Sequence, residues 1–234
     1  MRRLLLVSTS TVHGTGYLEH CAAQARQLFS GCRLIAFVPY ALADHDGYAR
    51  HVAERFRDWD LELVSVHTEK RPADLVEKAD GLFIGGGNTF RLVRDLYAFE
   101  LVNPIRRRAE RGMPYMGTSA GSNVACPTLG TTNDMPIVAP PSFETLALVP
   151  FQINPHYIDL DSASTHMGET RDQRLAEYFE ENHRHVLALR EGAMLEIRGE
   201  RMTLRGVPGG KHFRRGANPR EIADGADLSA LLRD

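Results

Sequence analysis

A serine flanked by glycines is the first feature of this sequence with the potential for chemistry. The segment Gly117-Thr118-Ser119-Ala120-Gly121 follows a short apolar run, residues 113–116, and precedes residues able to open a helix. At a sharp strand-to-helix turn of this kind a serine hydroxyl is exposed, and small neighbours let a substrate carbonyl come close. The amide of Ala120 can then donate a hydrogen bond to the oxyanion. We therefore predict that Ser119 is a nucleophile, the alternative being a plain glycine-rich turn.

A serine nucleophile needs a base to take its proton and a third group to hold that base. Of the ten histidines, His156 has the best setting, because Asn154-Pro155-His156-Tyr157 comes just past a strand-like run. The orienting acid is either Asp134 or Glu191. Asp134 keeps the chain order serine, acid, histidine of α/β-hydrolases, and we prefer it on that ground. Weaker candidates for the base lie in or near predicted loops: His13, His45, His67 and His166.

Two further segments are suited to binding a substrate. Gly85-Gly86-Gly87-Asn88-Thr89 offers bare amides at a strand end, for a second oxyanion donor or a phosphate. It is not G-x-G-x-x-G and lacks the G-K-[ST] ending of a P-loop, so a dinucleotide site is disfavoured. Gly168-Glu169-Thr170-Arg171 opens a helix, where ordinary capping explains its composition. An arginine at this point can also clamp a carboxylate through two parallel hydrogen bonds, and the glutamate can hold an amino group.

The elements around these segments alternate along the chain. Apolar strands are predicted at residues 3–8, 33–38, 61–66 and 81–84, and helices at 17–30, 47–59, 72–79, 90–97 and 104–111. This alternation is typical of a doubly wound, mostly parallel α/β sheet, whose sites lie beyond the carboxyl ends of the strands. Later residues are rich in proline, but a strand at 148–153, a helix at 170–182, a strand at 185–189 and an antiparallel pair at 194–197 and 202–207 are predicted. The tail from Gly216 is polar and predicts no element.

The bulk composition restricts the class of protein. A chain of 234 residues, 43% hydrophobic with a net charge of −2, predicts a single domain covering residues 1–234. The balanced charge argues against a nucleic-acid partner, and no apolar stretch is long enough to span a membrane. Three cysteines lack metal or redox spacing, so we expect neither a metal nor another cofactor. The apolar run after Met1 is too short for a signal peptide, which makes a cytoplasmic location the default expectation.

Taken together and in order, these segments resemble the peptidase E family, the cytoplasmic α-aspartyl dipeptidases. The likeness rests on five motifs: Gly85-Gly86-Gly87-Asn88-Thr89, Gly117 to Asn123, Thr132-Asn133-Asp134-Met135-Pro136, Asn154-Pro155-His156-Tyr157 and Gly168-Glu169-Thr170-Arg171. It runs from the first predicted strand to about Gly210.

The resemblance implies a flavodoxin-like sheet related to the class I glutamine amidotransferases, with serine in place of their cysteine. It implies Ser119 as nucleophile, His156 as general base and Asp134 as third member, with Glu191 also admitted at that position. Gly87 and Ala120 would supply the oxyanion amides. The family cleaves dipeptides with an N-terminal aspartate, so we expect a serine dipeptidase, as monomer or homodimer, that acts on a small-molecule substrate. Residues expected to bind that substrate are Asn88, Glu169 and Arg171.

Three other functions fit parts of the pattern. A cyanophycinase-like hydrolase of β-aspartyl-arginine would need extra acidic groups for the guanidinium, and no dedicated acidic cluster is seen in the sequence. A non-catalytic, flavodoxin-like ligand-binding protein would use Ser119 only to hydrogen-bond an anion. An amidotransferase would need a cysteine at position 119, whereas Cys126 lies beyond the turn.

Overall fold

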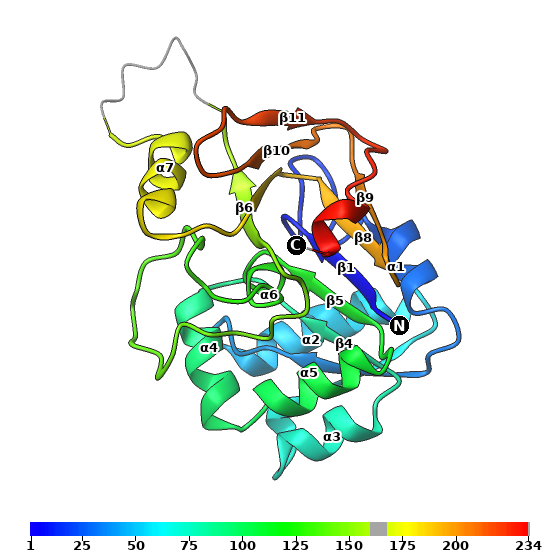
Figure 1. Ribbon diagram of the computed structural model, residues 1–234. Helices are drawn as coiled ribbons and strands as arrows, with labels where there is room; N and C mark the ends of the chain where they lie inside the picture. Colours follow the sequence, from blue (N-terminus) through cyan, green and yellow to red (C-terminus); the bar gives the residue numbers. More distant parts are fainter. Residues whose placement is uncertain (160–167, 234) are drawn as a thin grey trace.

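The computed structural model describes residues 1–159 and 168–233, and its main body is a seven-stranded sheet (Figure 1). The strand order is β3-β2-β4-β5-β1-β8-β9. The first five strands in this order run parallel to one another, whereas β8 pairs antiparallel with β1 and β9 pairs antiparallel with β8. The strands span Arg3–Val7 (β1), Leu34–Val38 (β2), Glu62–Ser65 (β3), Gly81–Ile84 (β4), Tyr115–Thr118 (β5), Met194–Arg198 (β8) and Arg201–Arg205 (β9).

Helices cover both faces of this sheet (Figure 1). They span Ala22–Leu28 (α1), His45–Arg57 (α2), Pro72–Lys78 (α3), Thr89–Ala98 (α4), Val102–Glu110 (α5) and Ala120–Asn123 (α6), with a 3₁₀ turn at Val66–Thr68. Leu4 and Leu6 of β1 pack in one hydrophobic cluster with α3, α4 and α5, whereas Leu5 and Val7 pack in another with α1 and α2. This alternation is that of a strand buried on both faces, and it makes the sheet doubly wound. No helix among the described residues is long and apolar enough to cross a membrane.

A second, smaller sheet stands beside the first and carries α7 (Arg171–Glu181) (Figure 1). Its order is β11-β10-β7-β6, in which only β6 and β7 are parallel. Tyr157 of β6, Phe213 of β10, and Leu175 and Phe179 of α7 form its hydrophobic cluster. The strands span Gln152–Tyr157 (β6), Val186–Arg190 (β7), Gly210–Phe213 (β10) and Arg220–Ile222 (β11), and a 3₁₀ turn follows at Ser229–Leu232.

The predicted doubly wound parallel sheet and the antiparallel pair at its edge are confirmed. Most predicted boundaries lie within two residues of those observed, and the starts of two elements differ by more. The strand expected at 148–153 begins at Gln152, because Pro150 has no amide to pair. The helix expected at 17–30 begins at Ala22, because Leu18 has a φ of 55° and cannot belong to a right-handed helix. The polar tail, for which nothing was predicted, supplies β11 and the last 3₁₀ turn.

A charged network joins the strands of the second sheet at the end where β6 and β7 stop. The Arg190 guanidinium donates to both carboxylate oxygens of Asp159, at 2.6 and 2.9 Å, and to both of Glu221, at 3.0 Å each. The ammonium of Lys211 lies 2.8 Å from the same Asp159. The hydrogen bond from Arg190 holds the pKa of Asp159 well below its usual range, and Lys211 acts in the same direction. The ionised form of Asp159 is therefore part of the folded state.

We predict that Asp159→Asn lowers the stability of the protein at neutral pH. A carboxyl with a depressed pKa in the folded state stabilises above its unfolded pKa of about 4, and this contribution is lost as the pH falls through the folded value. The side chain of Asp159 is 45% exposed, so solvent screening reduces the expected loss to about 1 kcal/mol. Thermal unfolding of the wild type and of Asp159→Asn at pH 7 and at pH 3 would measure this loss of stability. The difference between the two proteins should be smaller at pH 3.

Glu200→Gln is the matched control, because Glu200 is also an acid paired with an arginine, Arg233, but both side chains are largely exposed. It should change the melting temperature little at either pH. A stability loss for Asp159→Asn that stays the same at pH 3 would contradict the role given to its charge.

Candidate active site

The chain turns sharply at Ser119, between β5 and α6. Ser119 has a φ of 52° and a ψ of −111°, a conformation that costs a non-glycine residue energy and raises its side chain above the end of the sheet. A Cβ at Gly121 would lie 2.1 Å from the carbonyl oxygen of Ile84, so only glycine lets α6 approach β4 this closely. The Ser122 hydroxyl donates to the carbonyls of Val7 and Gly117, at 2.7 and 2.8 Å. The turn predicted around Ser119 is therefore a tightly held strand-to-helix corner.

His156 reaches this serine from the second sheet. Its Nε2 lies 2.9 Å from the Oγ of Ser119, and its Nδ1 lies 2.9 Å from the Oε1 of Glu191. The pairing of β6 with β7 is irregular between Asn154 and Tyr157, and His156 has a φ of 52°. This bulge turns the imidazole out of the strand and toward the first sheet. Glu191 directly follows β7, the neighbour of β6.

The arrangement has the hydrogen-bond polarity that a general base requires. An imidazole that donates its Nδ1 proton to the Glu191 carboxylate leaves Nε2 free to accept the proton of Ser119. The side chains of His156 and Glu191 are 35% and 52% exposed, so the site is open to a ligand. These groups can activate a serine oxygen for attack on a carbonyl carbon.

The glycine-rich turn after β4 lies against Ser119. A Cβ at Gly86 would come within 3.1 Å of the Cβ of Ser119 and 3.7 Å of its Oγ. Gly87 has a φ of +132° and no room for a side chain, since a Cβ would lie 2.5 Å from the carbonyl of Ala41. Ala120 is the first residue of α6, where amides have no intrahelical acceptor. The structure thus brings the glycine turn and the start of α6 to the same serine.

Asp134 does not lie where an orienting acid was expected. Its Oδ2 accepts from the amide of Thr89 at 2.7 Å, from the hydroxyl of Thr89 at 2.6 Å and from that of Thr132 at 3.1 Å. Among the described residues it is Glu191, and not Asp134, that hydrogen-bonds to His156. The preference for Asp134, which rested on chain order, therefore disagrees with the geometry. A carboxylate at the first amide of α4 stabilises that helix end and the glycine turn before it.

The residues expected to bind substrate differ in their contacts. Asn88 caps α4 and is used within the protein: its Oδ1 accepts from Arg91 N at 3.0 Å and its Nδ2 donates to the Met135 carbonyl at 2.8 Å. Glu169 lies 3.5 Å from Arg174. The side chain of Arg171 has no hydrogen bond or ion pair to residues 1–159 or 168–233. Burial lowers its pKa, and the nearby Arg174 adds to this effect.

Three contacts beside these groups were not predicted. The Ser8 hydroxyl accepts from the amide of His156 at 2.9 Å. The Tyr157 hydroxyl donates to Asp172 at 2.5 Å and accepts from Lys211 at 2.9 Å, which brings the start of α7 next to the strand of His156. Burial, and then the bond to Asp172, raise the pKa of Tyr157 to about 12. The only sequence signal for these contacts was that Ser8 and Tyr157 lie at strand ends.

Other reactive groups lie away from this constellation. The thiol of Cys126 is fully buried and accepts from the amide of Ile153 at 3.2 Å, and burial raises its pKa. His166 lies outside the described residues.

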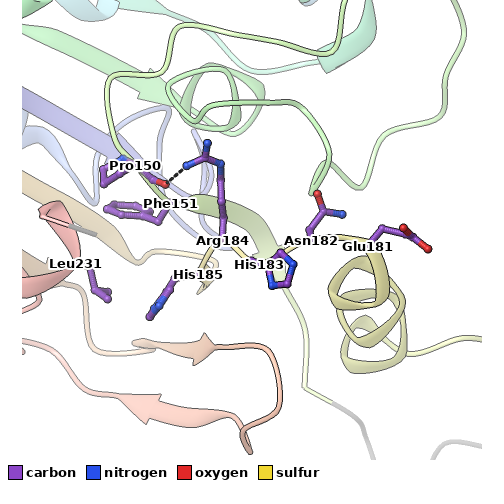
Figure 2. A pocket seen from close by; sticks show the side chains of 8 residues that line it. All are labelled: Pro150, Phe151, Glu181, Asn182, His183, Arg184, His185 and Leu231. Carbon is purple, nitrogen blue, oxygen red and sulfur yellow. Dashed lines mark hydrogen bonds between the residues drawn. The ribbon is translucent and has the colours of Figure 1, made fainter.

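A pocket of about 650 Å³ lies at the amino ends of β6 and β7, where Arg184 donates to the carbonyl of Pro150 (Figure 2). Because His156 and Glu191 lie at the opposite ends of these strands, the pocket is separate from them.

Comparisons with known proteins show which family this chain resembles. Residues 4–205 match the family model described as Peptidase family S51. The chain is 52% identical to Peptidase E of Streptomyces coelicolor over 98% of its own length and 94% of that protein. It is 46% identical to the probable alpha-aspartyl dipeptidase of Drosophila melanogaster, over 99% and 98% of the two chains. The crystal structure of a peptidase from an acI-B1 actinobacterium superposes with a TM-score of 0.70 at 17% identity, over 97% and 96% of the chains, which supports the flavodoxin-like fold.

Replacing each acid by its amide should distinguish their roles, because the change removes charge and keeps size. We expect Glu191→Gln to slow the labelling of Ser119 by a fluorophosphonate probe by roughly 10²- to 10⁴-fold, since the imidazole loses its orienting carboxylate. We expect Asp134→Asn to slow it by less than about 10-fold, because a side-chain amide can still accept the bonds from Thr89. The reverse ranking, with unchanged melting temperatures, would show that Asp134 orients His156.

Proposed function

The chain belongs to peptidase family S51 and is a serine peptidase, and from this premise we propose that it hydrolyses dipeptides with an N-terminal aspartate. The observation that carries the proposal is the continuous hydrogen-bonded series Ser119, His156 and Glu191, with both bonds at 2.9 Å. The relative from Drosophila is named for α-aspartyl dipeptides, and that specificity is what we infer for this chain. In this proposal Glu191 takes the place that was expected for Asp134.

The first half of the reaction forms an acyl-enzyme. His156 Nε2 removes the proton of Ser119 as Oγ attacks the carbonyl carbon of the aspartyl residue. The negative charge that develops on the carbonyl oxygen is stabilised by the amides of Gly87 and Ala120. The imidazolium is stabilised by Glu191 and gives its proton to the leaving amine as the C–N bond breaks. The second residue of the dipeptide leaves, and the aspartyl group remains as an ester on Ser119.

The second half returns the enzyme to its starting state. His156 removes a proton from a water molecule, and the hydroxide attacks the ester carbonyl. The same amides stabilise the second oxyanion. The proton then passes from His156 to Oγ, which restores the serine and releases free aspartate. The proposal needs no metal or organic cofactor, because proton transfer and oxyanion stabilisation come from the chain itself.

Selectivity for aspartate requires a cation for its side-chain carboxylate, and Arg171 has the properties of one. Its guanidinium is half-buried and has no ion pair among the described residues, so an incoming carboxylate would replace water. The bond between Tyr157 and Asp172 holds the start of α7 beside the strand that carries His156. Glu169, two residues before Arg171, is our candidate for the substrate amino group. We propose no direct contact between the Asn88 side chain and the substrate, because this side chain caps α4 and so supports the glycine turn before it.

The expected location is the cytoplasm. Cys21, Cys32 and Cys126 are all free thiols, and Cys21 and Cys126 are buried. Free cysteines fit a reducing compartment, and we keep this location and a monomeric or dimeric state as parts of the proposal.

We predict that the protein cleaves Asp-Leu and not Glu-Leu, β-Asp-Leu or β-Asp-Arg. Ser119→Ala should lower kcat for Asp-Leu on the order of 10⁶-fold, to a rate near background. The rate at which free leucine or arginine is released measures both the substrate preference and the effect of Ser119→Ala. Cleavage of β-Asp-Arg in place of Asp-Leu would instead identify a cyanophycinase-like specificity. Full activity in Ser119→Ala would refute the assignment of Ser119 as the nucleophile.

A second experiment tests the carboxylate clamp. Arg171→Met should lower kcat/KM for Asp-Leu by about 10²-fold, because a paired charge is lost in a partly buried site. Arg171→Lys should recover only part of the loss, since an ammonium does not reproduce the two parallel bonds of a guanidinium. Arg57→Met, in the last turn of α2, is the control and should leave kcat/KM unchanged. Unchanged kcat/KM in Arg171→Met would refute the clamp.

A further inference from the structure

The hydroxyl of Ser8 lies behind the catalytic groups, where the two sheets meet. Ser8 directly follows β1 and is fully buried. Its Oγ accepts from the amide of His156 at 2.9 Å and donates to the carbonyl of Leu189 at 2.8 Å. A single hydroxyl on the first sheet thus contacts both strands of the second sheet that lead to the base and to Glu191.

The bond to His156 replaces one that the second sheet cannot make. The pairing of β6 with β7 is interrupted between Asn154 and Tyr157, so the amide of His156 lies in a break of the ladder. A buried amide without an acceptor is costly, and the left-handed φ of 52° at His156 adds strain. The Ser8 oxygen provides the acceptor and fixes the backbone in the orientation from which the imidazole reaches Ser119.

The hydrogen bond from Ser8 to the carbonyl of Leu189 fixes the backbone near Glu191. Leu189 precedes Glu191 by two residues, and its carbonyl is bound by Ser8 at the point where β7 ends. The amide of Ser8 donates in addition to the carbonyl of Ala193, two residues after Glu191, at 3.0 Å. The short segment that carries the glutamate is therefore attached to Ser8 on both sides.

The nucleophile is attached to the adjoining residue. The carbonyl of Val7 accepts from the amide of Ser119 at 3.0 Å and from the hydroxyl of Ser122 at 2.7 Å. Val7 pairs with Thr118 in the parallel register of β1 and β5. Val7 and Ser8 together therefore set the distance between the serine on one sheet and the histidine on the other.

We propose that Ser8 is a positioning residue for catalysis, whose hydroxyl holds His156 and the segment of Glu191 in register with Ser119. It touches no substrate atom and acts through His156. The proposal rests on the triad of the proposed function. It predicts a loss in kcat with little change in KM, because Ser8 has no part in binding the dipeptide.

The test compares Ser8→Ala, Ser8→Thr and Ser8→Cys with the wild type. We expect Ser8→Ala to lower kcat for Asp-Leu by about 10²-fold, the size of effect that a small displacement of a catalytic group produces. Ser8→Thr keeps the hydroxyl and should retain more activity than Ser8→Cys, which keeps the size but bonds weakly. If Ser8→Ala does not fold, the comparison of kcat between Ser8→Thr and Ser8→Cys still tests the role of the hydroxyl. The proposal would be overturned by an unchanged kcat in Ser8→Ala. It would also be overturned if kcat of Ser8→Cys were as high as that of Ser8→Thr.

A double-mutant cycle separates positioning from a general structural effect. If Ser8 acts through His156, then Ser8→Ala has no further effect on fluorophosphonate labelling in a His156→Ala background. An equal effect in both backgrounds would show a structural role only. If His156→Ala itself were fully active, the proposed triad would fail, which is a different outcome from a failure of Ser8 alone.

Ser65→Ala is the matched control. Ser65 is also a buried serine at the end of a strand of the same sheet, and its hydroxyl donates to the Phe37 carbonyl at 3.4 Å. It ends β3, the outermost parallel strand, and contacts no residue of the triad among its described partners. We expect it to leave kcat unchanged. A loss of kcat as large as that of Ser8→Ala would mean that any buried serine lost from this sheet has the same effect.

Discussion

The proposed reaction depends on one hydrogen bond that crosses between two sheets, from Ser119 Oγ to His156 Nε2. The serine directly follows a strand of the seven-stranded sheet, and the histidine belongs to the four-stranded sheet. The chemistry therefore requires the two sheets to be held at a constant separation. The fold meets this requirement with short polar contacts, not with apolar packing alone. Asn123 of α6 donates to the carbonyl of Ile153 in β6 at 2.9 Å, and Ser8 contacts the second sheet through His156 and Leu189.

Two of the non-glycine residues with a left-handed backbone conformation lie at the candidate site. Ser119 and His156 both have a φ of 52°, which is unfavourable for residues with a Cβ. At each of them the amide is bound by a group of the first strand or the residue after it: the Val7 carbonyl for Ser119 and the Ser8 hydroxyl for His156. Strained conformations persist only where the surroundings determine them. The first strand and the residue after it thus bind the backbone at both Ser119 and His156.

Two acids near the site illustrate how position decides role. Asp134 binds the amide and hydroxyl of Thr89 and so stabilises the start of α4 and the glycine turn. Glu191 stands at the end of β7 and meets the imidazole. Next to it, Arg190 is bound to Asp159 and Glu221 and joins the strand ends. This end of β7 is therefore held by an ion network, while Glu191 itself remains available to His156.

The sequence by itself determined the corner at Ser119, the alternation of strands and helices, and the candidates for base and acid. These features depend on local conditions: glycine where backbones approach closely, as at Gly121, and apolar runs where a strand is buried on both faces. Only the tertiary structure showed that Glu191, and not Asp134, hydrogen-bonds to His156, and only it revealed the contacts of Ser8. Both depend on β6 pairing with β7 in a second sheet beside β1, and such contacts between distant segments leave no local pattern of residue types in the chain.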